Sequence, residues 1–538
     1  MEFNLADLFE AVADAIPERE AIVCGERRLT FAQLDERATR LAHWLAARGV
    51  APGDHIGLYL YNGTEYIEAS LAAYKIRAVP ININYRYVEE ELRYLFDNAD
   101  LVGVIHHREF GPRIAAVAGD LPGLRTFLAV EDGSEADCST IGPDKYEEAL
   151  ASSSSARDFP PRSADDLYIL YTGGTTGMPK GVMWRQEDLF FAALSGGNPY
   201  GAPPETPEQA AENAKNGQVV VSFPVAPLMH GAAQWAAFIF LFAGGKTVLA
   251  PGKRFDPAAV WRLVQDEKVQ AVSIVGDAIG RPLAEELEKN PSYDTSSLMV
   301  IGSGGATFSE GVKAQLRAKL PNVALLDTFG GSEGGNQGHG VERDADAPGP
   351  RFQSSDHTAV LDENFRPLAP GSGVVGMLAR RGRIPLGYYK DAEKTAKTFI
   401  DAHGTRWVVP GDMAMVEADG TITLLGRGSV CINTGGEKVF PEEVEAALRS
   451  HPAIFDAVVV GVPDERWGER VAAVVQLRDG HSLMLEDMDA HARKHIAGYK
   501  VPRLLHVVAE MQRQPSGKAD YRWAKAQATE AAQSTGVT

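Results

Sequence analysis

Residues 168–181 read YILYTGGTTGMPKG, a short apolar run that leads directly into a loop of glycine, threonine and lysine. The nine residues 172–180 hold three glycines, three threonines and one lysine. Glycines let backbone N–H groups approach an anion, threonine hydroxyls add hydrogen-bond donors, and Lys180 supplies positive charge. A plain surface turn needs none of these features at the end of a buried strand. We therefore predict a strand at 168–171 and, after it, a loop that binds a polyphosphate.

This loop differs from two other nucleotide-binding patterns. The P-loop of ATPases requires Gly-Lys-Ser/Thr at the start of a helix, whereas here Pro179 precedes Lys180 and Gly181 follows it. A second glycine cluster, GSGGA at residues 302–306, lacks the last glycine of the dinucleotide-binding fingerprint. The sequence therefore favours neither a P-loop ATPase nor a dehydrogenase.

The segment before the loop alternates between two periodicities. Residues 31–48 repeat apolar side chains at spacings of three and four, which predicts a helix that lies on a core. Thr30 and Gln33 have the form of a capping box at its start, and Gly49 is placed to end it. Further patterns predict strands at 55–61, 78–83 and 101–107, and helices at 65–76 and 89–98. Strands separated by helices predict an α/β fold of mainly parallel sheets flanked by helices.

The composition is that of a globular protein of several domains, with 538 residues, 44% hydrophobic and 23% charged. The formal net charge of −19 argues against nucleic acid or an anionic membrane as a partner. The longest apolar stretch, residues 232–243, is shorter than the roughly 20 residues of a membrane-spanning helix, so we expect no integral membrane segment and a cytoplasmic location. Cys24, Cys138 and Cys431 are far apart and suggest neither a disulfide framework nor a zinc site.

A domain boundary is predicted near the arginine of the segment Gly-Arg-Gly-Ser at 426–429. Turn-rich strands at 414–426 precede it, and roughly 110 residues, enough for a small domain, follow it. We predict a large domain at 1–426, a hinge at 427–429 and a small C-terminal domain at 430–538.

Residues 330–334, GGSEG, formally match the G-x-S-x-G pattern of serine hydrolases, with Ser332 as the nucleophile. That pattern requires a tight turn from a strand into a helix. The residues that follow, GNQGHG at 335–340, are poor helix formers. An esterase is therefore a competing but weaker hypothesis.

Several motifs together resemble the adenylate-forming superfamily, in particular the acyl-CoA synthetases. They follow the family order: YTGGTTGMPKG (171–181), APLMHG (226–231), TFGGSEGG (328–335), VPGD (409–412), GRGSVCINTGGEKVFPEEVE (426–445) and QPSGKADY (514–521). Gly173 stands where the family usually has serine, and Ser429 stands at a hinge position that is usually acidic or lysine. The resemblance spans nearly the whole chain. It implies a large N-terminal adenylation domain with a β-rich subdomain and a small, mobile α+β C-terminal domain.

The resemblance also implies a reaction in two steps. A carboxylate attacks the α-phosphorus of ATP to give acyl-AMP and pyrophosphate, and the thiol of CoA then displaces AMP. Most of the catalysis is stabilisation of charge on phosphoryl oxygens. The implied cofactors are ATP, CoA and Mg²⁺, the implied substrate is a small-molecule carboxylic acid, and a homodimer is compatible with this reading. An adenylation enzyme that loads the thiol of a carrier protein would share the motifs of the first step.

Single residues take their implied roles from the matching motifs. Lys518, Glu333, Lys180 and Thr175 would be catalytic, and Glu333 would hold the metal. The residues that would bind ATP are Thr172, Gly173, Gly174, Thr175, Thr176, Gly177, Lys180, Gly304, Gly305, Ala306, Asp327, Thr328, Phe329, Ser332, Asp412, Arg427 and Lys518. Those that would contact CoA are Gly435, Gly436 and Lys438.

The acyl pocket would be lined by His230, Trp235, Val275, Gly304, Gly330 and Gly331. Small residues dominate this set. Gly331 replaces the bulkier side chain that the family often has, so we expect a roomy, mostly apolar pocket. A bulky branched or ring-bearing acid, for example a steroid side-chain acid, fits this pocket, and a medium- or long-chain fatty acid is the alternative. Asp277 either meets a polar group of the substrate or caps the adjacent turn.

Overall fold

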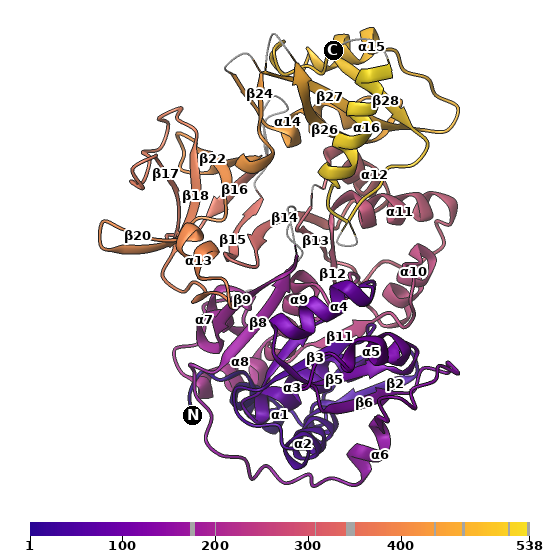
Figure 1. The fold of residues 1–538 in the computed structure, drawn as a ribbon, viewed down its shortest axis with the longest axis vertical. Coiled ribbons are helices and arrows are strands. Elements are labelled where there is room, and N and C mark those ends of the chain that lie inside the picture. The colour runs from indigo at the N-terminus through magenta and orange to yellow at the C-terminus, as the bar shows by residue number, and fades with distance from the viewer. Residues whose placement is uncertain are drawn as a thin grey trace.

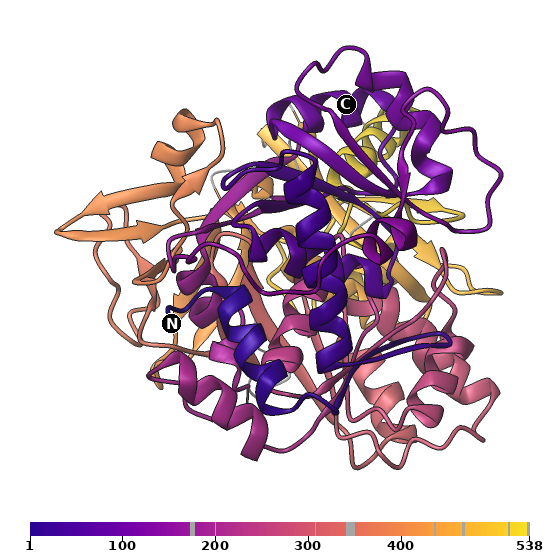
Figure 2. The same ribbon diagram turned by 90° about the horizontal axis from the view of Figure 1, so that it is seen from below.

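The computed structural model describes residues 1–538 except 173–177, 200, 307, 341–349, 435–436, 465–467, 515–516 and 535–538. Figure 1 shows the N-terminal layers in indigo and magenta at the bottom, a β-rich segment in orange at the left and the C-terminal unit in yellow at the top. Seen from below in Figure 2, the orange segment extends to one side of the N-terminal layers.

The first sheet is parallel and confirms the predicted alternation of strands and helices. Its strand order is β4-β3-β5-β6-β7, from β3 (His55–Tyr59), β4 (Val79–Asn82), β5 (Leu101–His107), β6 (Thr126–Val130) and β7 (Asp144–Lys145). The helices of this part of the chain are α1 (Leu5–Ala15), α2 (Phe31–Ala47), α3 (Thr64–Lys75), α4 (Glu89–Asn98), η1 (Arg108–Phe110), α5 (Gly111–Ala118) and α6 (Tyr146–Ala151). The capping box of Thr30 and Gln33 is present at the start of α2, and Gly49 after it has φ of 79°.

The second sheet changes character along its width. Its first part pairs β2 (Arg27–Thr30) with a parallel series in the order β1 (Glu20–Cys24), β11 (Lys246–Leu249), β10 (Val221–Pro224), β12 (Ala271–Ile274), β13 (Val300–Gly304) and β14 (Ala324–Gly331). The helices along this series are α7 (Gln186–Ala192), η2 (Ser195–Gly197), α8 (Pro207–Asn216), α9 (Gly231–Phe242), α10 (Pro257–Asp266), α11 (Gly276–Lys289) and α12 (Glu310–Lys319).

From β14 onward the same sheet is antiparallel and forms the predicted β-rich subdomain. Its strands are β15 (Gly335–Gly340), β16 (Arg351–Ser354), β17 (Thr358–Leu361), β18 (Gly376–Arg381), β20 (Phe399–Ala402), β21 (Thr405–Val408), β22 (Asp412–Val416) and β23 (Ile422–Arg427), with α13 (Ala392–Thr398) beside them. A third, small sheet joins β8 (Leu167–Thr172), β9 (Lys180–Arg185) and β19 (Gly387–Tyr388). The predicted strand at 168–171 is therefore confirmed.

The C-terminal unit is an α+β structure with a sheet of its own. Its strands are β24 (Ile432–Thr434), β25 (Glu437–Val439), β26 (Ile454–Asp464), β27 (Gly468–Leu477) and β28 (Leu504–Val508), and its helices are α14 (Pro441–Arg449), α15 (Leu485–Ala492) and α16 (Tyr521–Ser534). The turn η3 (Gly428–Val430) links this unit to β23. The division at 427–429 and the movement of the small unit stay predictions.

Helix α9 is the apolar stretch that the sequence singled out. Its buried face, including Ala237 and Leu241, packs into the main hydrophobic cluster with α1 and α2. None of the helices in the described part of the chain combines the length and the apolar character that a membrane span requires.

Candidate functional site

The turn between β14 and β15 carries Ser332 and Glu333. It joins two antiparallel strands, with Gly331 opposite Gly335. Because a strand and not a helix follows Ser332, the turn lacks the strand-to-helix geometry that a hydrolase nucleophile requires. The esterase hypothesis for Ser332 is therefore not supported by the fold.

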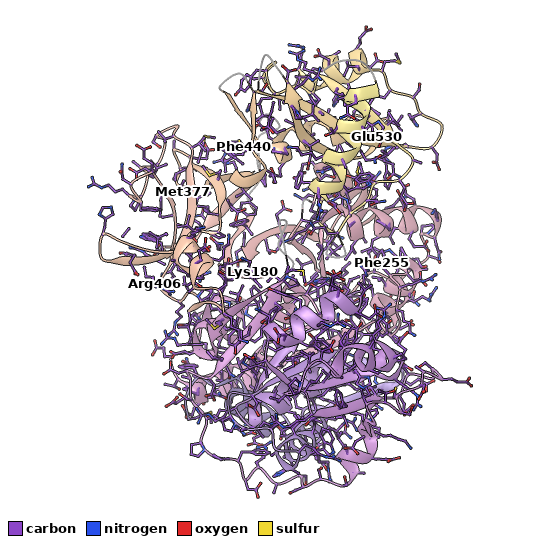
Figure 3. The ribbon with its side chains drawn as sticks, viewed as in Figure 1. Lys180, Phe255, Met377, Arg406, Phe440 and Glu530 are labelled. Carbon is purple, nitrogen blue, oxygen red and sulfur yellow. The ribbon has the colours of Figure 1, made fainter. Side chains whose placement is uncertain are left out.

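Lys180 begins β9 and faces an acidic partner far along the chain. Thr172 and Lys180 are paired at the end of the β8–β9 hairpin, so the two residues that flank the predicted phosphate loop are adjacent. The ammonium group of Lys180 lies 2.7 Å from Oδ2 of Asp391, and both side chains are partly exposed. The hydrogen bond from Lys180 and the backbone N–H of Lys394 hold the pKa of Asp391 below its usual value. Figure 3 places Lys180 near the centre of the molecule.

Tyr388 connects this ion pair to the turn with Glu333. Its ring centroid lies 6.0 Å from the Lys180 ammonium nitrogen, and its hydroxyl donates to Oε1 of Glu333 at 2.8 Å. The indole N–H of Trp184 donates to the carbonyl oxygen of Ser332 at 2.9 Å. The structure thus brings Lys180, Ser332 and Glu333 into one cluster.

Two of the segments predicted to bind ATP, residues 304–306 and 327–329, begin side by side. Strands β13 and β14 are parallel, with Gly304 opposite Thr328. The Thr328 hydroxyl donates to the carbonyl oxygen of Ser303 at 3.0 Å, and a Cβ at Gly304 would come within 2.7 Å of that hydroxyl oxygen. Glycine at 304 is therefore required for this close pairing. Asp327, which precedes Thr328 on β14, forms an ion pair with Lys313 at 2.6 Å. Phe329 packs against Phe352. Ala306 lies in the bend after β13.

The loop that carries Lys518 lies against the start of α11. A Cβ built on Gly517 would lie 3.4 Å from Cβ of Ala278 and 3.7 Å from Cγ1 of Val275. The same methyl of Val275 lies 4.0 Å from the Cβ position of Gly305. Val275 therefore lies between Gly305, which is predicted to bind ATP, and the residue before Lys518, more than 200 residues further along the chain.

Asp412 and Arg427 are cross-strand partners at the ends of β22 and β23. Their pairing places two residues that are predicted to bind ATP side by side at the ends of two neighbouring strands of the β-rich subdomain. Lys438 belongs to β25, but its side chain, like the loop residues Gly173, Gly174, Thr175, Thr176 and Gly177 and the pair Gly435 and Gly436, lies outside the described residues.

The predicted acyl-pocket residues divide into anchored and open positions. The indole N–H of Trp235 donates to the Tyr168 hydroxyl at 3.1 Å, and the ring packs against the main hydrophobic cluster. His230 immediately precedes α9. A Cβ on Gly330 would come within 2.3 Å of the carbonyl oxygen of Gly335, whereas one on Gly331 would meet, among the residues that the structure describes, only Oε2 of Glu333, at 4.0 Å. Gly330 is thus required by the hairpin, and the described residues leave space beside Gly331.

Both carboxylate oxygens of Asp277 have partners within the protein. Its Oδ1 accepts from the backbone N–H of Ser309 at 2.8 Å, and its Oδ2 lies 3.3 Å from Arg281. The guanidinium of Arg281 in turn lies 4.9 Å from the ring centroid of Phe455 in the C-terminal unit. Asp277 therefore has structural partners, but its backbone partner is Ser309, 32 residues away, and not the adjacent turn that the sequence predicted.

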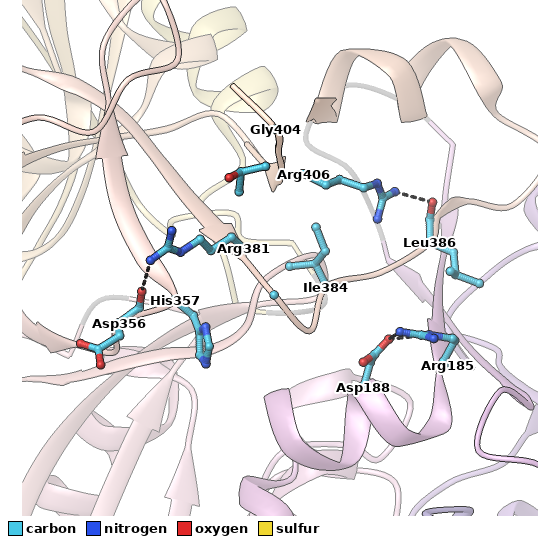
Figure 4. Close-up of a pocket in the computed structure, with 11 residues that line it drawn as sticks. Arg185, Asp188, Asp356, His357, Arg381, Ile384, Leu386, Gly404 and Arg406 are labelled. Atoms are coloured by element: carbon cyan, nitrogen blue, oxygen red, sulfur yellow. Dashed lines mark hydrogen bonds and ion pairs between the residues drawn. The ribbon is translucent and has the colours of Figure 1, made fainter. Parts of the chain in front are cut away.

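A cavity of about 560 Å³ lies away from these motifs (Figure 4). Arg185 at the far end of β9, Asp188, Arg381, Ile384 and Arg406 are among its lining residues. Within the described part of the chain, His, Cys, Asp and Glu do not gather in groups of three or more that could hold a metal.

Sequence reasoning missed Trp184, Tyr388, Asp391 and Arg380. Asp391 has a local signal, because its side chain accepts from the backbone N–H of Lys394 and caps α13. Its pairing with Lys180, 211 residues earlier, has no signal in the sequence.

Comparison with known proteins agrees with this geometry. The AMP-binding enzyme family matches residues 9–389, and the AMP-binding enzyme C-terminal domain matches residues 443–518. The chain is 51% identical, over 98% of its length and 96% of the relative's, to a 3-oxocholest-4-en-26-oate–CoA ligase of Rhodococcus rhodochrous. It is 49% identical, over 97% and 96%, to a medium/long-chain-fatty-acid–CoA/3-oxocholest-4-en-26-oate–CoA ligase of Mycobacterium marinum.

Solved structures share the whole fold at lower identity. An anthranilate CoA ligase in complex with anthranoyl-AMP superposes with a TM-score of 0.85 at 21% identity, over 98% of both chains. ATP-bound MatB from Rhodopseudomonas palustris superposes with a TM-score of 0.82 at 24% identity, over 98% of this chain and 99% of that one. The chain therefore belongs to the family of AMP-binding enzymes, the adenylate-forming group that its motifs resemble.

Proposed function

We infer that this chain is an AMP-forming acid–thiol ligase, which activates a carboxylic acid with ATP and passes the acyl group to CoA. The observation that supports this function is the proximity of Gly517, the residue before Lys518, to Val275 beside Gly305, at the nucleotide site that we propose. Relatives that are about half identical over nearly the full length bear the name of CoA ligases, which supports the same activity.

In the first step, an oxygen of the acid bonds to the α-phosphorus of ATP and the bond to pyrophosphate breaks. Negative charge develops on the phosphoryl oxygens, and Lys180 and Lys518 are the cations that we propose to stabilise it. Asp391 accepts a hydrogen bond from Lys180 and sets the position of its ammonium group. In the second step the CoA thiol attacks the acyl carbon and AMP leaves.

Glu333 is the residue that we propose to hold Mg²⁺. One of its oxygens accepts from Tyr388, and a carboxylate has lone pairs left for a cation. Mg²⁺ typically takes one or two carboxylates and fills its other positions with phosphate oxygens and water, so a single glutamate fits this use. When bound, the metal supplies charge neutralisation on the phosphates. Asp412, with two acceptor oxygens, suits the ribose hydroxyls, and Arg427 stands opposite it.

The acid that we propose is bulky and largely apolar. The space beside Gly331, and beside Gly302, where a Cβ would meet nothing within 4 Å, supports a ring-bearing acid such as one with a steroid side chain. The relatives named for 3-oxocholest-4-en-26-oate support the same class, and those named for medium- and long-chain fatty acids support a second one.

The test is a panel of carboxylic acids scored for AMP release with and without CoA. With a steroid side-chain acid or a C8–C16 fatty acid, the enzyme should release AMP and form thioester over many turnovers only when CoA is present. Acid-dependent exchange of labelled pyrophosphate into ATP should occur without CoA. Exchange that proceeds normally while CoA gives no thioester would indicate a carrier-protein thiol instead, and an absence of exchange with every acid would refute the function. The homodimer and the cytoplasmic location stay predictions.

A further inference from the structure

Arg380 is a buried cation behind the turn that carries Glu333. Only 5% of it is exposed, although it is the penultimate residue of β18 and its neighbour Arg381 is exposed. One of its terminal nitrogens, Nη1, donates to the carbonyl oxygen of Gly334 at 2.6 Å and also to that of Asn336. A single guanidinium thus ties together the two ends of the segment 334–336.

The charge of Arg380 is not neutralised by a carboxylate in the described part of the chain. Its hydrogen-bond acceptors there are the two carbonyl oxygens, and its buried Nε has none. Burial alone lowers the pKa of Arg380 to about 10, which still leaves it protonated at neutral pH. Buried charges are normally paired, because removal from water is costly, so a position such as this one calls for an explanation.

The explanation lies in what the neighbouring side chains do to the same turn. Trp184 donates to the carbonyl of Ser332, Tyr388 donates to the carboxylate of Glu333, and Arg380 donates to the carbonyls of Gly334 and Asn336. Three strands, β9, β19 and β18, therefore each supply one donor side chain to the segment 332–336. Glu333 lies within the segment that they hold.

We propose that Arg380 is a positioning residue for Glu333: it fixes the turn so that the carboxylate is presented to the metal. This inference rests on the proposed function, because it assumes that Glu333 holds Mg²⁺. Residues that orient a metal ligand typically change metal affinity 10–100-fold when removed.

The variants to compare are Arg380→Met, which keeps length and removes the donors, and Arg380→Lys, which keeps the charge but not the planar fork. Arg381→Met is the matched control, since successive side chains of a strand point to opposite faces and Arg381 lines the cavity of Figure 4. Binding of Mn²⁺ in the presence of α,β-methylene-ATP, followed by electron paramagnetic resonance, measures the metal site without turnover.

Arg380→Met should weaken Mn²⁺ binding by about tenfold, Arg380→Lys by less, and Arg381→Met not at all. The amides of residues 331–336 should exchange with deuterium faster in Arg380→Met than in Arg381→Met. Because Arg380 acts through Glu333, Arg380→Met combined with Glu333→Gln should bind Mn²⁺ no worse than Glu333→Gln alone.

Wild-type Mn²⁺ affinity in a folded Arg380→Met protein, or additive losses in the double variant, would overturn the proposal. If Arg380→Met does not fold, Arg380→Lys decides, and wild-type affinity together with wild-type exchange at 331–336 would overturn it. Should Glu333→Gln itself leave Mn²⁺ binding unchanged, the metal role in the proposed function fails first, so the two failures are distinguishable.

Discussion

The turn with Glu333 and the loop with Lys518 are held in opposite ways. The turn receives hydrogen bonds from Trp184, Tyr388 and Arg380, all within the N-terminal part of the chain. The loop of Lys518 is braced inside the C-terminal unit, where Gln514 N–H donates to the Lys518 carbonyl at 2.9 Å. It meets the N-terminal part through close packing of Gly517 on Val275 and Ala278.

This difference matches what the two-step reaction requires. A group that binds the phosphates gains from a rigid support, since correct position lowers the barrier without reorganisation. A group that is needed in the first step alone gains from a contact that can open at small cost. We therefore expect the turn to be a fixed part of the site and the loop to be a docked one.

The largest expected effect is that of Lys518→Ala. If the loop docks only for the first step, acyl-AMP synthesis should fall by on the order of 10²-fold or more, as for loss of one positioned transition-state donor. Conversion of supplied acyl-AMP and CoA to thioester should persist. Feeding each half-reaction separately to the purified variant measures both. Lys525→Ala, on α16 of the same unit, is the control and should change the rate of neither step. If the rates of both steps fell equally in a folded Lys518→Ala protein, the loop would not dock for the first step alone, and the distinction from the turn would be wrong.

Gly331→Val tests whether the space beside the turn holds the acyl group. The side chain has room, so the protein should fold, but it would occupy the space that we assign to the acyl group. We expect kcat/KM for a ring-bearing acid to drop by about tenfold relative to that for a short-chain acid, the effect of one or two added methyl groups in a pocket. Gly311→Ala on α12, where a Cβ also meets nothing within 4 Å, is the matched control. Equal loss for both acids would place the acyl group elsewhere.

Phe455→Leu should weaken the contact between the C-terminal unit and Arg281 without changing the turn that carries Glu333. Leucine keeps apolar volume but removes the aromatic face beneath Arg281, an interaction worth roughly two- to fivefold in an equilibrium. Adenylation should slow by about that factor, with the thioester step unchanged, in separate half-reaction assays. Phe255→Leu, at an exposed phenylalanine of the N-terminal part, serves as the reference. A slower thioester step would show that Arg281 and Phe455 do not act on the docked arrangement.

Thr30→Ala should have the smallest effect on chemistry. It removes the capping box of α2, far along the chain from both the turn and the loop, and should lower the free energy of unfolding by about 1 kcal/mol. Denaturant unfolding measures that loss. Both half-reaction rates per folded molecule should equal those of the wild type, and any change in their ratio would mean that general stability, not docking, sets the balance between the steps.

Local features of this fold were predictable because their causes lie within a few residues. The capping box of Thr30 and Gln33, the left-handed Gly49 and the strand Leu101–His107 depend on hydrogen bonds and periodicity along one short segment. The motifs around Lys180, Glu333 and Asp412 were recognisable for the same reason, and the enzyme family followed from their order.

Only the tertiary structure decided which groups meet. Tertiary contacts set Asp391 against Lys180, Arg380 against the Glu333 turn, and Gly517 beside Val275, across separations of tens to hundreds of residues. The sequence by itself determined the local elements, the motifs and the chemistry that they imply, because each rests on neighbours along the chain. The supports of the site depend on sheet register and on the packing of separate units, and no local pattern encodes those contacts.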